Sequence, residues 1–495
     1  MSYCSMQELI GVNRRRFIRT AGATGVGASI AGCLGGENGS DGSDGSDGSD
    51  GETTLQITLL SQMTEQAING FEPALKEAGL SEDITFEINT ATPGQLEQQY
   101  RQWLNAGRGD PDILLMDVGW SIPFIRRGQL LNLNDHFSGD EIDTLESEFK
   151  GPSVDSSRGR DGDLFGVPFI MDVRGVMYRK DHAEAAGYDP EAESWGSEPM
   201  SWGEFSQIVS DVKQQQDLEY GMTMPFELSQ TITCCAFNGM MSQWGGTYFG
   251  GRDNLFGPIG DRPVTVDEEP VLNALRMLRT FMHGHDDEHS LDESEFAGDI
   301  VPSEALGWRY TTDMESFIAG DAFAYTVGQL GLLQQIAGSV DGDVNDVIGM
   351  IPYPYGIEPS ESEYAGLGGS VSPLAGYNLS VNPNSDKIDA ALDVLRVVLT
   401  DEFHRSYFEV SGSLPPKPSV FESEALTEHE MFGQYLDTFR IAAENPVPRP
   451  VTPIYFQQAD IIAQEVHNVV SQGKPPEEGM VDLKEQLEQI EENNA

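Results

Sequence analysis

The stretch from residue 55 to residue 116 constrains the fold most, because its hydrophobic pattern switches repeatedly between the period of a strand and that of a helix. Residues 55–59 and 84–88 alternate between apolar and polar side chains, which predicts strands. Helices are predicted after each of them, where apolar residues recur at spacings of three and four. Residues 112–116 form a nearly all-apolar run, typical of a parallel strand buried on both faces. This order predicts a doubly wound α/β unit.

Asp117 and Trp120 directly follow the predicted strand at residues 112–116. In doubly wound units, ligands bind beyond the carboxyl ends of the strands, so both residues stand where a ligand site is expected. Each residue also has a second interpretation: Asp117 as a helix cap, and Trp120 as a core residue under the next helix. The pattern leaves both interpretations open.

The length of the chain predicts a second unit. About 440 residues follow the N-terminal region described below, and a single hydrophobic core seldom grows beyond roughly 250–300 residues. Further strands and helices are predicted at residues 165–169, 175–178, 201–212, 270–283, 312–319, 322–327, 390–399, 459–470 and 483–490. We therefore expect two α/β domains.

The charge of the chain excludes a general attraction to nucleic acid and argues against docking on an anionic lipid surface. The chain has 81 acidic and 29 basic residues, which gives a formal net charge of −52. Binding of nucleic acid requires clustered Lys and Arg, and an anionic lipid surface would repel such a protein. Because 39% of the residues are hydrophobic, as in a globular protein, we interpret the charge as a halophilic surface that stays soluble in concentrated salt.

The N-terminal region combines a basic pair, a short apolar run and a cysteine. Arg14 and Arg15 resemble a twin-arginine export signal, and the tetrapeptide Ile-Ala-Gly-Cys that ends at Cys33 resembles a lipobox. The apolar run is too short to span a bilayer, which needs about 20 residues. The alternative is a basic N-terminus with a chance cysteine. We expect residues 1–33 to direct export, and a lipid on Cys33 to anchor the protein at the extracellular face of the cytoplasmic membrane.

Residues 34–53 predict a flexible tether. Between Gly39 and Gly51 the motif Gly-Ser-Asp repeats four times without any apolar residue. Such a segment cannot bury enough surface to offset its ordering entropy. We expect it to space the folded body from the membrane and to carry no chemistry.

Cysteine usage predicts no disulfide framework. Of the four cysteines, Cys4 lies in the export signal and Cys33 in the anchor, which leaves the neighbours Cys234 and Cys235. Adjacent cysteines rarely bond to each other, so we interpret this pair as small buried apolar residues. A vicinal bridge is the alternative.

Several phrases occur in an order that resembles the family 1 extracellular solute-binding proteins, the maltose-binding-protein-like receptors of ABC importers. These phrases lie at residues 111–120, 128–133, 164–172, 176–181, 201–205, 317–324, 368–369, 377–383 and 412–416. Each phrase alone is weak, and their joint order carries the resemblance. It covers nearly all of residues 54–495.

The resemblance implies a type II periplasmic-binding-protein-like fold, in which two doubly wound α/β lobes close on a solute by hinge motion. Lobe one would hold residues 54–170 and 374–412, and lobe two residues 174–372 and 417–495, with three crossings between them. It further implies a monomeric, non-enzymatic receptor without cofactor or metal. Its partners would be a small solute, most readily a sugar or a sugar derivative, and the permease and ATPase subunits of an importer.

Ligand residues follow from the same resemblance. Asp172, at the first crossing, joins Asp117 as a carboxylate that can accept solute hydroxyls, with a hinge-stabilising acceptor as its alternative role. The remaining candidates are mostly rings that can stack on a sugar, or core residues: Trp120, Trp244, Trp308, Gly369, Tyr455 and Phe456. Leu330 stands where the family often has a tryptophan, which leaves open a smaller sugar, a polyol phosphate or a non-sugar solute.

Two rival functions remain. A secreted hydrolase acting on carbohydrate could use Asp117 and Asp172 as a carboxyl pair, and a structural surface protein would bind no solute. His283, His285 and His289 form the one histidine cluster, which could hold a metal, but the surrounding acidic residues favour a surface loop.

Overall fold

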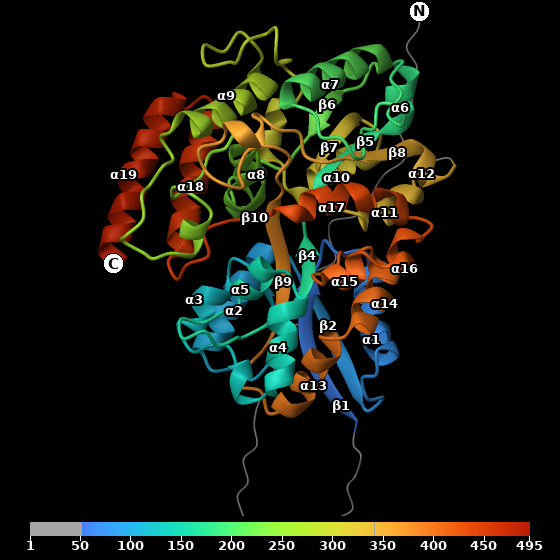
Figure 1. Ribbon diagram of the computed structural model, residues 1–495, viewed down its shortest axis with the longest axis vertical. Helices are drawn as coiled ribbons and strands as arrows, with labels where there is room; N and C mark the ends of the chain where they lie inside the picture. The colour runs from blue at the N-terminus through green and yellow to red at the C-terminus, as the bar shows by residue number, and fades with distance from the viewer. Residues whose placement is uncertain (1–51, 341) are drawn as a thin grey trace, which may run out of the picture. The chain divides into compact units, whose positions relative to one another are not determined.

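The computed structural model describes residues 52–340 and 342–495. The predicted export signal lies outside these residues, as does nearly all of the predicted tether at residues 34–53. The described chain forms two α/β lobes, each built on a β-sheet (Figure 1). The predicted α/β class is confirmed. None of the described helices is both long and apolar enough to cross a membrane.

The first lobe is built on a six-stranded sheet with the order β10–β9–β3–β1–β2, in which β4 also pairs with β9. Its strands are β1 (Thr53–Leu60), β2 (Ile84–Ala91), β3 (Ile113–Asp117), β4 (Val167–Asp172), β9 (Pro373–Val381) and β10 (Val447–Pro448). β1, β2 and β3 run parallel, as the sequence predicts. β9 returns from the second lobe and runs antiparallel to β3 and β4, so the sheet is mixed.

The helices of the first lobe bury most of the apolar residues of this sheet in one core. They are α1 (Glu65–Glu77), α2 (Pro93–Asn105), α3 (Ser121–Ile125), α4 (Gly139–Glu148), α5 (Gly151–Asp155), α13 (Ile388–Val398) and α14 (Asp401–Ser411). All five residues of β3 are buried, which fits a strand covered on both faces.

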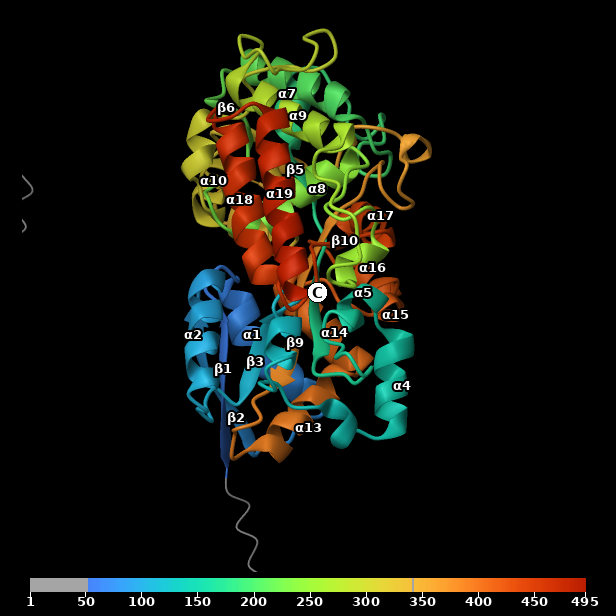
Figure 2. The ribbon, with the colours of Figure 1, turned by 90° about the vertical axis from the view of Figure 1, so that its left-hand side faces the viewer.

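The second lobe is built on a four-stranded sheet with the order β6–β7–β5–β8. Its strands are β5 (Gly175–Arg179), β6 (Tyr220–Thr223), β7 (Ala322–Gly328) and β8 (Ile348–Ile351). Its larger helices are α7 (Trp202–Gln216), α8 (Phe237–Gln243), α9 (Glu269–His283), α10 (Tyr310–Ile318), α17 (Leu436–Glu444), α18 (Tyr455–Val470) and α19 (Pro476–Asn494). α9, α18 and α19 pack against one another on one side of this lobe (Figure 2).

Short helices complete the chain. The α-helical ones are α6 (Lys180–Ala185), α11 (Leu332–Ala337), α12 (Val344–Val347), α15 (Pro418–Phe421) and α16 (Glu424–Thr427). The 3₁₀ turns are η1 (Leu133–Asp135), η3 (Asp253–Phe256), η4 (Ser303–Gly307), η5 (Pro359–Glu361) and η6 (Gly433–Tyr435), whereas η2 (Ile232–Ala236) is a π-helical turn.

The chain passes between the lobes where β4 ends and β5 begins, and again where β9 enters the first sheet. α18 also joins the lobes. Tyr455, Phe456 and Ala459 at its start pack in the first-lobe core, whereas its residues from Ile462 onward pack in the second-lobe core. The start of this helix, within the segment predicted to belong to lobe two, therefore lies against the first lobe.

Candidate functional site

A cavity of about 860 Å³ lies between the two lobes and is lined by residues of both. The first lobe contributes the ends of β1, β3 and β4, and the second contributes the region around α10, η2 and the end of β7. This volume is within the range of about 300–1,000 Å³ that is usual for small-molecule sites.

The register of β9 brings the two predicted carboxylates to one face of the first sheet. Asp117 of β3 is paired with Tyr377, and Asp172 of β4 is paired with Ala375. Residues two apart on a strand face the same side, and so do directly paired residues on neighbouring strands. All four residues line the cavity, so this face of the sheet is its floor.

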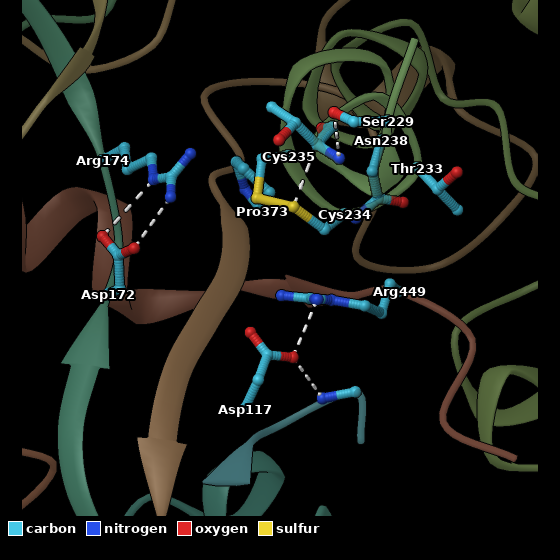
Figure 3. The surroundings of a disulfide bond; sticks show 12 residues. Asp117, Asp172, Arg174, Ser229, Thr233, Cys234, Cys235, Asn238, Pro373 and Arg449 are labelled. Carbon is cyan, nitrogen blue, oxygen red and sulfur yellow. Dashed lines mark hydrogen bonds and ion pairs between the residues drawn. A yellow bond between two sulfur atoms is a disulfide. The ribbon is translucent and has the colours of Figure 1, made fainter. Parts of the chain in front are cut away.

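Asp117 is buried beside the guanidinium of Arg449. Nη1 of Arg449 donates to Oδ1 of Asp117 over 2.8 Å, and the backbone N–H of Gly119 donates to the same oxygen over 2.8 Å (Figure 3). Burial raises the pKa of Asp117, and the charge of Arg449 offsets this only in part. Although burial lowers the pKa of Arg449, the charge of Asp117 outweighs it and holds that pKa above its usual value.

Arg449 has unused hydrogen-bonding capacity. Its Nε and Nη2 atoms are buried without a well-formed hydrogen bond to the described residues, although the buried hydroxyl of Tyr455 lies near this guanidinium and interacts with it. Buried donors without partners are rare in folded proteins, because each costs about 1–3 kcal/mol. Arg449 lines the cavity, although these two nitrogen atoms are themselves closed to solvent.

Asp172 forms a second pair, with Arg174, and links the two lobes. Nη2 of Arg174 donates to Oδ2 of Asp172 over 2.8 Å, and Nε donates to Oδ1 over 3.3 Å. From the second lobe, Nε2 of Gln329 also donates to Oδ1 over 2.9 Å. Nη1 of Arg174 donates to the hydroxyl of Tyr310 over 2.7 Å. Asp172 therefore lines the cavity and contacts both lobes at the crossing, and its role toward a solute stays a prediction.

The predicted aromatic residues divide between the cavity and the cores. Trp120 and Trp308 line the cavity: Trp120 is 4% exposed and also belongs to the first-lobe core, whereas Trp308 is only partly buried. The structure places Tyr455 and Phe456 in the first-lobe core, and the guanidinium of Arg101 lies 4.0 Å from the centre of the Phe456 ring.

Two other candidates lie elsewhere in the second lobe. Trp244 is buried in its core, where its indole N–H donates to the sulfur of Met277 over 3.4 Å. Gly369 has a φ of +70°, and a side chain there would collide with Pro359. Neither Trp244 nor Gly369 is among the described residues that line the cavity.

Residues 68–433 match the family described as bacterial extracellular solute-binding protein. The chain belongs to this family. Maltose-bound MalE3 of T. maritima has a similar fold, with a TM-score of 0.70 and 19% identity over 88% of this chain and 100% of that one. A tagatose-bound solute-binding protein of an ABC transporter from Thermotoga lettingae gives a TM-score of 0.66 and 17% identity over 89% and 100%.

A sequence relative is a lactose-binding protein of Rhizobium radiobacter. It is 30% identical over 140 residues, which are 26% of this chain and 29% of that protein. The chain thus aligns with less than a third of this relative's length. The solved structures establish the fold, and together with the family match they confirm the family-level prediction.

Some cavity residues of this family member were missed by sequence reasoning. The chain has only 29 basic residues, and four arginines line this one cavity: Arg101, Arg174, Arg309 and Arg449. In so acidic a chain, arginines near predicted strand ends are a usable signal.

Cys234 and Cys235 also line the cavity, and they form a disulfide. Their predicted burial is confirmed, but the interpretation as two unlinked apolar side chains is wrong. The rule that adjacent cysteines rarely bond describes ordinary backbone, whereas these two lie in the π-helical turn η2.

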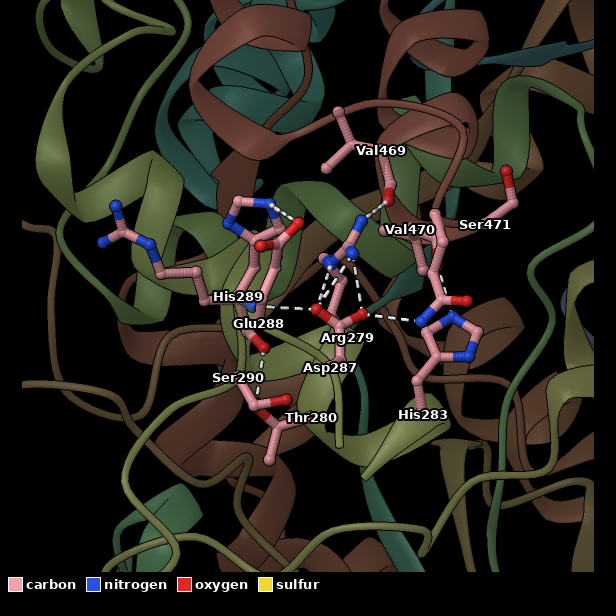
Figure 4. Close-up of polar contacts among 12 residues, drawn as sticks. Arg279, Thr280, His283, Asp287, Glu288, His289, Ser290, Val469, Val470 and Ser471 are labelled. Atoms are coloured by element: carbon pink, nitrogen blue, oxygen red, sulfur yellow. Dashed lines mark hydrogen bonds and ion pairs between the residues drawn. The ribbon is translucent and has the colours of Figure 1, made fainter. Parts of the chain in front are cut away.

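His283 and His289 of the histidine cluster lie beside a buried ion pair of Arg279 and Asp287 in the second lobe (Figure 4). His283 and His285 hydrogen-bond through Nε2 to separate backbone carbonyls, at 2.7 and 2.9 Å, and Nε2 of His289 lies 3.7 Å from Glu288. Within residues 52–340 and 342–495, no group of three or more potential ligands is arranged to hold a metal ion.

Proposed function

We propose that this protein is the receptor of an ABC importer and that it captures a sugar or sugar alcohol in the cavity between its lobes. The observation that carries the proposal is the cavity floor, where two carboxylate–arginine pairs, Asp117–Arg449 and Asp172–Arg174, lie on one face of one sheet. The structural relatives named above contain bound maltose and tagatose, and the sequence relative is named for lactose.

The chemistry of the floor suits a solute with many hydroxyls. A hydroxyl donates one hydrogen bond and accepts others, so it can meet a carboxylate and a guanidinium together. Carboxylate oxygens of Asp117 and Asp172 accept from it, and the arginines that line the cavity, Arg309 and Arg449 among them, can donate to it. Trp308 offers a partly exposed ring for the apolar face of the solute.

Capture would proceed by hinge closure around the floor. We assign residues 54–170 and 374–412 to lobe one, and 174–372 and 417–495 to lobe two, with the start of α18 as an additional contact. Asp172 is well placed for this, because it accepts from Arg174 beside it and from Gln329 of the second lobe. The closed pair of lobes would then present a joint surface to the permease and ATPase subunits.

The proposal is tested by calorimetric titration with maltose, lactose, tagatose, ribitol and mannitol, together with mass spectrometry of any solute that co-purifies. Binding should compact the protein, which small-angle scattering measures. Failure to bind any of these compounds, with no co-purified solute and no compaction, would remove the support for a hinge-closing receptor.

Export and anchoring are proposed from residues 1–33, which the structure does not describe. Cys33→Ser should release the protein into the medium or leave it unprocessed, because the thiol would carry the lipid. Replacing Arg14 and Arg15 by lysine should block export, since the ammonium group does not reproduce the guanidinium pair. Wild-type membrane retention of the Cys33 variant would refute the anchor.

The net charge of −52 supports a halophilic setting. Self-repulsion among the carboxylates destabilises the folded state, and salt screens it, with a Debye length of about 10 Å at 0.1 M and about 3 Å at 1 M. The unfolding temperature should therefore rise between 0.1 and 2 M KCl. A flat curve would show that the charge is balanced in another way.

A further inference from the structure

The disulfide of Cys234 and Cys235 lies at the wall of the cavity rather than in a core (Figure 3). The two residues are 8% and 5% exposed, yet they belong to none of the three large hydrophobic clusters. They form a small cluster of their own with Ala375 on the cavity floor. The two sulfurs and Ala375 thus form one apolar patch, which we call the sulfur patch.

The backbone under the sulfur patch is unusual in the same place. Cys234 and Cys235 lie in η2, a π-helical turn that precedes α8. Single π-helical turns occur frequently at functional sites. Neighbouring residues of an ordinary helix point about 100° apart, because a turn takes 3.6 residues. Two separate thiols would therefore diverge, whereas the disulfide holds both sulfurs together as one surface.

Polar groups flank the sulfur patch on two sides. In Figure 3 the Asp172–Arg174 pair lies to the left of the disulfide and the Asp117–Arg449 pair lies below it. The register explains this placement, because Ala375 under the disulfide is paired with Asp172, and Tyr377, two residues on, is paired with Asp117. An apolar surface bordered by carboxylates and guanidiniums matches a sugar ring, which has C–H groups on its faces and hydroxyls around its rim.

The segment that follows β7 offers little apolar surface to the cavity. Leu330, at the position where the family resemblance places a tryptophan, is only 1% exposed although it borders the cavity. Trp308 remains partly exposed, but it comes from the region before α10 and already packs edge-on against Tyr220. The sulfur patch lies at the floor beside partly exposed apolar side chains of the floor strands, Ile170 and Tyr377.

We propose that the Cys234–Cys235 disulfide is the surface on which one C–H face of a cyclic sugar packs, and that it favours ring sugars over open-chain sugar alcohols. A ring presents its C–H groups as one rigid face, whereas an open chain must lose rotational freedom to do so. This inference rests on the proposed receptor function and names the class of solute that the same site takes.

The test uses the full chain in three forms: wild type, wild type reduced with tris(2-carboxyethyl)phosphine, and Cys234→Ser/Cys235→Ser. Each form is titrated with maltose, lactose, tagatose and mannitol. Reduction and the double substitution should each weaken binding of the tightest ring sugar about fivefold, as expected when roughly 40 Å² of apolar area, counted over the disulfide and the sugar together, returns to water. Mannitol should bind weakly, or its affinity should change less than twofold on reduction or substitution.

Two controls separate the sulfur patch from other effects. The phosphine should not alter binding by the double variant, which still carries Cys4 and Cys33. Reoxidation of reduced wild type should restore its affinity for the ring sugar. This arm tests the disulfide without any substitution, so it still decides the question if the double variant fails to fold.

The outcomes are distinct. Ring-sugar binding that is unchanged by both reduction and substitution overturns the inference and leaves the receptor proposal standing. Binding of mannitol alone, or an equal loss for mannitol and ring sugars, also overturns it. A wild-type protein that binds none of these compounds and carries no co-purified solute overturns the receptor proposal together with this inference.

Discussion

The Asp117–Arg449 pair in the cavity and the Asp287–Arg279 pair in the second lobe are both buried, and they differ in how completely their hydrogen bonds are made. Asp287 accepts from Arg279, from Gln472 at 2.7 Å and from the backbone N–H of His289 at 2.8 Å. Arg279 also donates from Nη1 to the carbonyls of Val469 and Lys474, at 2.6 and 3.2 Å. Arg449 leaves Nε and Nη2 without a well-formed hydrogen bond to the described residues.

This difference separates a structural pair from a binding pair. A buried pair with every hydrogen bond made by protein ties its elements together, here the segment after α9 to the end of α18. A pair at a cavity wall whose hydrogen bonds are not all made by the protein is less tightly fixed and can adjust when a ligand binds. Burial and charge alone do not distinguish a structural pair from a binding pair. The hydrogen-bond partners of each carboxylate and guanidinium atom distinguish them.

The largest expected effect concerns the structural pair. Asp287→Ala leaves the guanidinium of Arg279 buried without its counter-charge, which should lower the free energy of unfolding by about 3–5 kcal/mol. Urea denaturation measures it, with Glu288→Ala, an exposed neighbour, as a control expected to change stability by less than about 0.5 kcal/mol. The folded Asp287→Ala variant should bind solute with the affinity of wild type. A lower affinity would contradict the assignment of the Asp287–Arg279 pair as purely structural.

The next effect concerns the cavity pair at the crossing. Asp172→Asn keeps the size of the side chain but removes the charged acceptor, so solute binding should weaken by about 1–3 kcal/mol, or roughly 5- to 150-fold. Calorimetric titration measures this. Stability should fall less than in the Asp287 variant, because the Asp172 side chain is 12% exposed and water can reach it. A variant that is strongly destabilised but binds normally would make Asp172 purely a hinge residue.

A smaller effect is a pH dependence of opposite sign at the two sites. Although burial raises the pKa of Asp287, hydrogen bonds from Gln472 and Arg279 outweigh it and hold this pKa below the usual value. In the unfolded chain the pKa of this carboxyl is about 3.9, and in the folded protein it is lower. Ionised Asp287 therefore stabilises the fold above a pH of about 3.9, and this stabilisation is lost as the pH falls through the pKa of the folded protein. Asp287→Asn should flatten the loss of stability in acid.

Asp117 should behave in the opposite way, because burial raises its pKa. The folded protein then takes up this proton at a higher pH than the unfolded chain, which favours folding as the pH falls from the folded pKa toward about 3.9. Asp117→Asn removes the stabilisation that comes from this proton uptake. The variant should therefore lose stability more steeply in acid than wild type, by at most about 1.4 kcal/mol per pH unit. The measurement is the free energy of unfolding as a function of pH. Parallel curves for wild type, Asp287→Asn and Asp117→Asn would refute the opposite pH dependence of the two sites.

The sequence predicted the elements better than the contacts between them. Alternation at residues 55–59 and 84–88 and the apolar run at 112–116 correctly located three strands, because the period of a pattern is local. The role of Arg449 could not be predicted, since its partner Asp117 is 332 residues away in sequence. The same holds for Tyr455, whose ring is buried because α18 begins against the first lobe.

The smallest expected effect is at the histidines near the structural pair. His283 and His285 already bond through Nε2 to carbonyls of different segments, and His289 approaches only the exposed carboxylate of Glu288, 3.7 Å away. Because these nitrogens do not converge, His289→Ala should change the free energy of unfolding by less than about 0.5 kcal/mol. Zinc chloride should leave the unfolding temperature of both wild type and variant unchanged, since an ion that binds only the folded state would raise it. A zinc-dependent rise in wild type that disappears in the variant would show that this network has capacity left for a ligand, and the contrast with the cavity would fail.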